Sequence, residues 1–422
     1  HLFIILDEYF EFNYNIKIKY EYDNNFPDLY ICPMSVHYPM DIYAKVEKLH
    51  LLHNEYYMQN NNITVELKEE VQNVIAGPET KFVNMNDRDR KELLKTYNNT
   101  FMYCLYNRHH CSPDDFEIVW NSRYLNCLKF KPNVRHTLGY YDGFHAAVFA
   151  HRWYQKRLPF QFYPALSSIG VLVEFHQGGE TGGNHDDGFN IPVGMSVEAR
   201  VKQVEQQRLG NPYYECEKFM TNGKGVKSNY TYYNCMTTSY NKLIYERCKC
   251  YGISIMKTLI VNTSESIDDI KFCMKWKRNT TEFLKSVECL VKSQDFFYKK
   301  KTVFDENCPD RCHNTDYDAQ KSYAKWPLIS QSRDLVHKLL VKDTLQYESF
   351  ISYLEQNGHA KLNTSNFGTV EFFENNDISD IAINDWARDN LVQMTIYLSQ
   401  DAVRKVVCYK SLFFLNIDNV ML

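Results

Sequence analysis

Apolar and polar residues alternate in four separate stretches of the chain. Ile16, Ile18, Tyr20 and Tyr22 alternate with charged residues. The same period of two recurs over residues 171–175, 197–201 and 392–398. Successive side chains of a strand point to opposite faces of a sheet, so each stretch predicts a half-buried β-strand.

Helical patterns lie between these strands. Residues 87–97 follow Asn86, a residue suited to cap a helix, and predict one helix. Residues 332–357 predict two short helices, with Gly358 suited to the position after a helix end. Their apolar stripe is Leu335, Val336, Leu339 and Leu340. Strands at both ends and in the middle, with helices inserted between them, predict an α+β fold.

Composition excludes few classes. The length of 422 residues suits one large domain or two to three smaller ones, and the net charge of −4 argues against a nucleic-acid partner. No segment reaches the roughly 18 to 20 apolar residues that span a bilayer. Residues 1–6, 412–415 and 420–422 are nonetheless apolar, which fits a segment between two membrane boundaries or two ordinary core segments.

Cysteine is the most informative residue type. The chain has 13 cysteines, and seven fall within residues 232–312. Such density favours an oxidising compartment and a disulfide-bonded fold, and the odd total leaves one sulfur without an intramolecular partner. A zinc site is the alternative, but His313 directly follows Cys312 and lacks the spacing of a ligand. We therefore expect no metal site. Six N-glycosylation sequons also favour an extracellular surface: Asn62, Asn98, Asn229, Asn262, Asn279 and Asn363.

Five motifs, in order along nearly the whole chain, resemble the epithelial sodium channel, degenerin and acid-sensing ion channel family. Residues 26–32, Phe-Pro-Asp-Leu-Tyr-Ile-Cys, resemble its "FPAVTIC" strand, and residues 209–216 resemble the turn before its first thumb cysteine. Cys248-Lys249-Cys250, the segment 308–312 and Trp326-Pro327 resemble its later cysteine and "WP" motifs.

The resemblance implies a disulfide scheme that spacing alone cannot choose. A further bridge of the family is missing, because Ser239 and Glu306 stand at both of its positions, and Cys408 is left unpaired. The implied pairs are Cys32–Cys127, Cys104–Cys111, Cys216–Cys312, Cys235–Cys308, Cys248–Cys289 and Cys250–Cys273.

The resemblance also implies a clenched-hand extracellular domain with a central antiparallel palm sheet. Residues 1–32 would lead from the first membrane helix into the first palm strand, and 411–422 would begin the second membrane helix. Between them we expect the finger at 33–101, palm and β-ball at 102–231, the disulfide-bonded thumb at 232–313, a palm strand at 314–331, the knuckle at 332–385 and the last palm strand at 386–410.

The function implied is that of a subunit in a homo- or heterotrimeric, sodium-selective channel of the plasma membrane, with paralogous subunits as partners. The membrane helices would flank this segment in the lipid bilayer, and no selectivity residue can be named. Sodium would be the permeant ion, with no cofactor. A non-conducting ectodomain, a binding subunit or a constitutively open channel stays an alternative. An enzyme is not expected, because no catalytic constellation has supporting spacing.

Proton gating is one alternative within the family. Its acid-sensing members use clustered carboxylates and a His pair, whose pKa values allow protonation near neutral pH. The His-pair positions here hold Asn13 and Tyr14, the stretch 151–157 is basic, and Val291 replaces one of two thumb carboxylates, leaving Asp295. We therefore expect weak or absent activation by acid.

Gating by an extracellular RFamide-type neuropeptide, as in molluscan and cnidarian members, is the hypothesis we favour. Aromatic and carboxylate side chains between finger and thumb would bind such a peptide. The candidates, which could equally be packing residues, are Trp153, Tyr154, Phe160, Asp295, Phe296 and Phe297.

Two further sets would act near the membrane. Tyr213 aligns with an aromatic that packs on the first membrane helix, where Phe10 and Phe12 lie, and could couple the palm to the pore. Three copies of Asp418 at the pore mouth would attract Ca²⁺. A plain structural contact and a solvated carboxylate are the alternatives.

Overall fold

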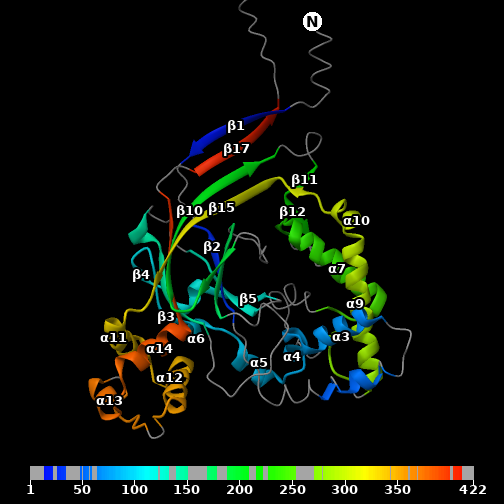
Figure 1. Cartoon of the computed structure of the whole chain (residues 1–422). Helices are drawn as coiled ribbons and strands as arrows, with labels where there is room; N and C mark the ends of the chain where they lie inside the picture. Colours follow the sequence, from blue (N-terminus) through cyan, green and yellow to red (C-terminus); the bar gives the residue numbers. More distant parts are fainter. Residues whose placement is uncertain are drawn as a thin grey trace, which may run out of the picture.

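We analysed a computed structural model of the chain, which combines two packed sheets with three groups of helices (Figure 1). The structure describes residues 14–21, 26–34, 48–49, 51–56, 58, 64–121, 124–132, 139–150, 169–177, 188–208, 215–221, 227–252, 270–277, 279–342, 344–359, 362–367, 369–399 and 403–410.

The larger sheet has eight strands in the order β1-β17-β10-β16-β7-β3-β4, with β15 also paired to β10. The strands are β1 Tyr14–Glu21, β3 Phe101–Tyr106, β4 His109–His110, β7 Phe144–Phe149, β10 Met195–Gln207, β15 His313–Lys325, β16 Leu391–Leu398 and β17 Val403–Lys410. The alternating stretches at 16–22, 197–201 and 392–398 therefore predicted real strands.

This sheet is mixed, which corrects the expectation of an antiparallel one. β10 runs antiparallel to β15 along its whole length but parallel to both β16 and β17. The expected last strand at 386–410 is also wrong in detail, because residues up to Asn390 are helical and two strands follow. Val201 pairs with the end of β16 and Val204 with β17, so the two strands continue one another along β10.

The smaller sheet has five strands in the order β5-β6-β2-β8-β9. They are β2 Asp28–Pro33, β5 Phe116–Asn121, β6 Leu125–Phe130, β8 Gly170–His176 and β9 Gly188–Pro192. One face packs on the larger sheet through a common core that includes Ile31, Val173, Val197 and Met394. β8 is buried at every residue rather than half-buried as predicted, because Leu172 on its opposite face packs into a second cluster around Cys32–Cys127.

The first helical group comprises α3 Val65–Ala76, α4 Pro78–Val83, α5 Asp87–Leu93 and α6 Tyr97–Thr100. The Asn86 side chain caps α5 by accepting a hydrogen bond from Asp89 N at 2.8 Å. The helix ends earlier than predicted, because Lys95 turns into the interior. Its Nζ donates to the carbonyls of Pro33 and Tyr124 at 2.5 and 2.8 Å, and burial lowers its pKa to about 7.

The second group, which we call the disulfide-bonded helices, comprises α7 Tyr232–Cys248, α9 Thr280–Lys299 and α10 Lys301–Asp305. Disulfides Cys248–Cys289 and Cys235–Cys308 tie α7 to α9 and to the segment after α10. The buried faces of α7 and α9 also share core clusters with α3 and α4: Ile244 lies in one cluster with Phe82, and Val287 lies in another with Val71.

The third group, the C-terminal helical cluster, comprises α11 Ile329–Leu339, α12 Leu345–Gln356, α13 Val370–Asn375 and α14 Asp380–Asn390. Its core surrounds Trp386, which is fully buried against Phe149 and Phe350. Gly358 has a φ of 103° just beyond α12, as its glycine predicted.

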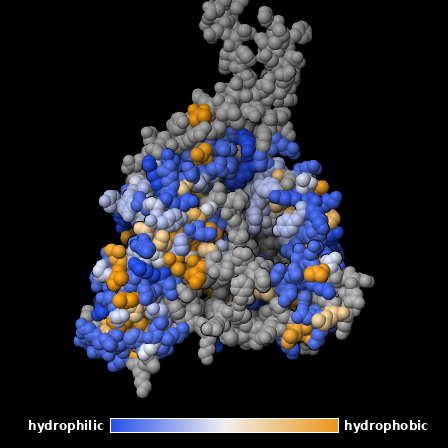
Figure 2. Space-filling view, in the orientation of Figure 1, coloured by the Kyte–Doolittle hydropathy of each residue, from blue (hydrophilic) through white to orange (hydrophobic). Residues whose placement is uncertain are grey.

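The two later groups lie on opposite sides of the sheets in Figure 1, joined by the long β10–β15 pair. The face seen in Figure 2 is mainly hydrophilic, and its hydrophobic residues form small separate patches.

Candidate functional site

The chain passes between the larger sheet and the disulfide-bonded helices at one place, which we call the junction. β10 ends at Gln207, and the chain reaches α7 through the short strands β11 Cys216–Glu217, β12 Phe219–Thr221 and β13 Lys227–Asn229. It returns from α10 through β14 Asp310–Arg311, which pairs with β11, and enters β15 at His313. The disulfide Cys216–Cys312 joins the two passages.

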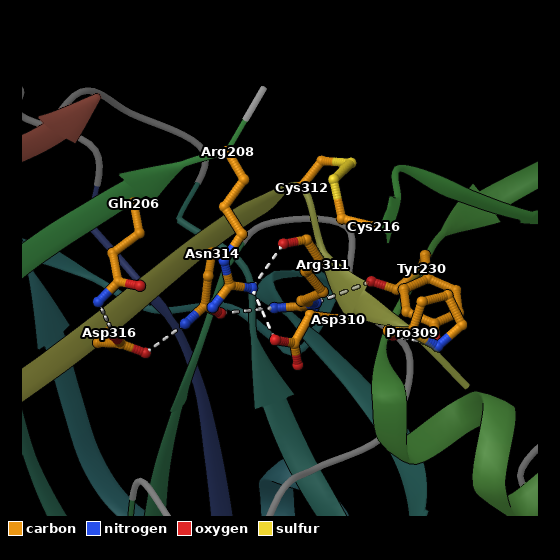
Figure 3. A network of polar contacts seen from close by, with 10 residues as sticks. All are labelled: Gln206, Arg208, Cys216, Tyr230, Pro309, Asp310, Arg311, Cys312, Asn314 and Asp316. Carbon is orange, nitrogen blue, oxygen red and sulfur yellow. Dashed lines mark hydrogen bonds and ion pairs between the residues drawn. A yellow bond between two sulfur atoms is a disulfide. The ribbon is translucent and has the colours of Figure 1, made fainter. Parts of the chain in front are cut away.

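Arg208 connects the end of β10 to the returning passage. Its backbone N–H donates to the carbonyl of Cys312 at 2.8 Å, and its Nη1 donates to the carbonyl of Arg311 at 3.0 Å. The same nitrogen lies 3.3 Å from a carboxylate oxygen of Asp310 (Figure 3). The Arg208 side chain thus contacts both a backbone carbonyl and a carboxylate of β14.

Arg311 and Tyr230 connect β14 to the segment before α7. Arg311 Nε donates to the carbonyl of Tyr230 at 2.8 Å, and the Tyr230 hydroxyl donates to the carbonyl of Pro309 at 2.6 Å (Figure 3). Burial, with the charges of Glu217 and Asp310 adding to it, raises the pKa of Tyr230 to about 12. The phenol therefore keeps its proton and stays a donor at neutral pH.

A row of side chains continues this network along the β10–β15 pair. Arg311 Nη1 donates to Asn314 at 3.3 Å, and Asn314 donates to Asp316 at 2.6 Å. Gln206 of β10 then donates to the other oxygen of Asp316 at 3.3 Å (Figure 3). Charge-assisted bonds of this kind are stronger than neutral ones, so the network resists separation of the two strands.

The junction lies next to the strands that carry the ends of the described chain. Residues Val204–Gln207 of β10 pair with Arg404–Val407 of β17, and β17 pairs with β1 over its whole length. Tyr14 is opposite Lys410, so the chain enters and leaves the sheet side by side. A displacement of the disulfide-bonded helices can therefore pass through the junction to both of these strands.

Sequence reasoning missed the junction residues Arg208, Tyr230 and Arg311. None of them belongs to an alternating or helical pattern, and their partners are mostly backbone carbonyls distant in sequence. The available signal was the pairing of Cys216 with Cys312, which brings their neighbours together.

The three ligand candidates on α9 do not share one surface. Asp295 is exposed and forms an ion pair with Lys299 at 2.8 Å, and Phe296 is half-buried beneath the Arg247 guanidinium at 4.0 Å. Phe297 is only 6% exposed and packs on Tyr240 and Phe304. Successive helical residues point about 100° apart, so Phe297 serves packing while its two neighbours face outward.

The other predicted residues have mixed outcomes. The six disulfides of the structure join the same pairs that the resemblance implies. Cys408 lies in β17 opposite Ile16. Of the sequons, Asn98, Asn279 and Asn363 are exposed and Asn229 is half-buried. The remaining candidates lie outside the described residues: Phe10, Phe12, Asn62, Trp153, Tyr154, Phe160, Tyr213, Asn262 and Asp418.

The described residues contain neither a metal-binding cluster nor a membrane-spanning helix. No group of three or more His, Cys, Asp or Glu side chains within the described ranges could hold a metal ion. Among the same residues, no helix has the length and hydropathy needed to cross a bilayer.

Comparison with known proteins gives a consistent family. Residues 1–408 match the family described as "Amiloride-sensitive sodium channel". The chain is 23% identical over 355 residues to an FMRFamide-activated amiloride-sensitive sodium channel of Cornu aspersum, covering 75% of this chain and 56% of that one.

Two other relatives are similar at the same level. The alpha subunit of the epithelial sodium channel of Xenopus laevis is 24% identical over 273 residues, covering 63% of this chain and 39% of its own length. The bile acid-sensitive ion channel of Mus musculus is 21% identical over 343 residues, covering 77% and 63%. The chain thus spans about two fifths to three fifths of the length of these three relatives. The family comprises ion channels rather than enzymes, and this chain belongs to it: it is a member of the amiloride-sensitive sodium channel family, with the epithelial sodium channels and degenerins.

Proposed function

We propose that the chain is the extracellular part of a subunit of a trimeric cation channel in the plasma membrane, opened by an extracellular neuropeptide. Sodium would be the permeant ion, and Asp418 would add a Ca²⁺ site at the pore mouth. In this proposal the larger sheet is the palm, α3–α6 belong to the finger, the disulfide-bonded helices are the thumb and the C-terminal helical cluster is the knuckle.

The junction supports the part of the proposal in which ligand binding at the disulfide-bonded helices is coupled to the pore. Arg208, Arg311 and Tyr230 connect the disulfide-bonded helices to β10 by hydrogen bonds of 2.6 to 3.0 Å, and β10 pairs directly with β17. A ligand that changes the position of α7 and α9 would therefore bias the strands that lead toward the membrane. A ligand acts in this way only if it binds the two arrangements with different affinity.

A peptide ligand is supported by one relative and one surface. The snail relative is named as FMRFamide-activated. On α9, the exposed Asp295 carboxylate pairs with Lys299 and the half-buried Phe296 ring lies beneath Arg247. A cationic, aromatic peptide would compete with these two basic side chains for the charge and the aromatic face. The burial of Phe297 removes it from this proposed contact, whereas Trp153, Tyr154 and Phe160 remain in it as proposals.

Weak activation by acid is supported by Val291 and Glu79. Val291 has no ionisable group, and at 2% exposure it is part of the core between α9 and α3. Glu79 of α4 lies close enough to Tyr240 of α7 for its charge to act on the phenol. Burial raises the pKa of Glu79 to about 8, so its carboxyl is already mostly protonated at neutral pH and changes little on acidification.

The test is expression of the full-length protein in oocytes, alone and with paralogous subunits, with current recorded under RFamide peptides and under a drop to about pH 6. We expect an amiloride-sensitive sodium current with peptide and little or none with acid. Asp295→Asn and Phe296→Ala should each raise the half-activating peptide concentration about tenfold, the loss typical of one charge-assisted or cation–π contact.

Glu288→Gln is the matched control, because Glu288 forms an equivalent (i, i+4) ion pair with Lys292 on the same helix. It should leave peptide sensitivity unchanged. Acid-evoked current without a peptide response would favour the proton-gated alternative, and surface expression without current under any condition would favour a non-conducting subunit.

A further inference from the structure

A cavity opens at the end of the disulfide-bonded helices, where α7 stops and α9 starts. It has a volume of about 300 Å³, which is the lower end of the range for small-molecule sites. Its lining comes from the end of α7, the segment 271–277 and the first half of α9. The lining residues are Arg247, Cys248, Cys250, Lys271, Phe272, Lys277, Glu282, Lys285, Ser286 and Cys289.

The cavity carries an excess of positive charge. Four of its residues are basic and only Glu282 is acidic. Lys277 Nζ lies 2.7 Å from Glu282 Oε1 and 3.0 Å from Ser286 Oγ, so this one carboxylate is already engaged. Lys271 lies close enough to Glu282 for its charge to act on the same carboxylate. The residues that line the cavity therefore carry three more positive than negative charges.

Two disulfides fix the walls that hold these charges. Cys248–Cys289 joins the end of α7 to α9, and Cys250–Cys273 joins the residues after α7 to the segment that carries Lys271 and Lys277. The buried Phe272 ring anchors the same segment in the core. The disulfides therefore keep the backbone positions of these basic residues close together, and a bound anion would lower the repulsion among their side chains.

We propose that this cavity binds an extracellular oxyanion, a carboxylate or a sulfate group, through Lys271, Lys277 and Lys285. Charge-assisted hydrogen bonds from several ammonium groups and the Ser286 hydroxyl suit such an anion. The site is separate from the peptide surface, although Arg247 lines the cavity and also stacks on Phe296 at 4.0 Å. A bound anion that moves Arg247 would therefore change the contact between Arg247 and Phe296, whether or not a peptide is the activating ligand.

The test is thermal unfolding of the full-length protein in lipid nanodiscs at constant ionic strength, with sodium chloride replaced stepwise by sodium sulfate or sodium acetate. Binding to the native state raises Tm in a saturable manner. We expect saturation with at least one of the two anions, and the more effective one identifies the preferred source. The double variant K271Q/K285Q should weaken the apparent affinity at least tenfold, the loss typical of a charge-assisted contact.

Two single variants make the result specific. E282Q removes the competing carboxylate and should tighten binding severalfold, which a general salt effect on stability would not produce. K292Q removes an exposed lysine of α9 that already pairs with Glu288, and it should leave the response unchanged. An equal response in all four proteins, or no saturable response to either anion in the wild type, would overturn the proposal.

Discussion

The disulfide-bonded helices and the C-terminal helical cluster are attached to the same pair of strands, but they are stabilised in different ways. The C-terminal cluster surrounds its own core of large side chains, including Trp386, Phe350 and Phe372, and its described residues contain no cysteine. The disulfide-bonded helices have only a small core of their own, around Met236 and Phe297, and share the rest with α3 and α4.

The difference indicates separate roles. A cluster that buries its own core is fixed to the sheet that it covers, as Trp386 is fixed against Phe149 of β7. A unit whose internal shape is kept by disulfides can change its shared contacts and still move as one body. We therefore interpret the C-terminal cluster as an anchor and the disulfide-bonded helices as the moving part.

The largest expected loss of stability is in the C-terminal helical cluster. Trp386→Ala should destabilise the protein by about 3–5 kcal/mol, because it leaves a cavity in a fully buried core and removes a hydrogen bond to Ser349. The check is thermal unfolding combined with hydrogen exchange, which should lose protection in α11–α14. Tyr245→Ala on α7, where the ring is 45% exposed, is the control and should cost far less. Equal costs would break the comparison.

A somewhat smaller effect is expected from the disulfides. The double variant C250S/C273S should cost about 2–4 kcal/mol and accelerate exchange in α7 and α9, but not in α11–α14. The pair C104S/C111S closes a loop of 7 residues rather than 23 and should cost less. Loss of protection in the C-terminal cluster would show that the two groups are not independent.

The junction should show a functional effect in addition to its effect on stability. Arg311→Met leaves the Tyr230 carbonyl without this donor and should cost about 1–3 kcal/mol. If the helices act on the pore through the junction, half-activation in the full-length channel should also shift severalfold. Arg333→Met breaks a comparable ion pair, to Asp380 in the C-terminal cluster, and should leave activation unchanged. A shift in both variants would refute a specific role of the junction.

A pH-dependent effect is expected at the contact between α4 and α7. Burial raises the pKa of Glu79 from 4.5 to about 8 in the folded protein. The folded state therefore holds the proton more tightly than the unfolded chain, and this stabilisation is complete below pH 4.5 and is lost as pH rises through 8. Glu79→Gln should flatten the dependence of Tm on pH between these values. An unchanged slope would mean that the carboxyl is not buried in this way.

The sequence predicted the positions of strands and helices better than their burial and their pairing. Alternation at 197–201 and 392–398 predicted strands correctly, since one face of each meets the core. It could not predict that β8 is covered on both faces, or that β10 and β16 run parallel, because both depend on partners distant in sequence. The helix at Asp87 was predicted too long because Lys95 is drawn inward by carbonyls of other segments.

The candidate site was less predictable than the fold. The family resemblance supplied the disulfide pairs, but it gave no reason to select Arg208, Arg311 or Tyr230. Each of these side chains acts on a main-chain carbonyl, and any residue type can supply a carbonyl. Such contacts leave no pattern in one sequence and become visible only when the passages of the junction are seen together (Figure 3).

β10 changes its partner along its length, from β16 to β17, and its two halves should therefore respond differently to force. Residues 196–201 are clamped between β15 and β16 in the core, and Gly194 at the clamped end fits so closely that an added Cβ would lie 2.9 Å from the Arg388 carbonyl. Residues 204–207 are also paired on both sides, with β15 and β17, but they lie beyond the core cluster that holds Val197, Ala199 and Val201. Load applied at Arg208 would therefore act first on this outer part of β10 and on its partner β17, and would leave the core-packed part in place. The stiffness of the outer part, rather than the stability of the whole domain, would then set how much force reaches β17.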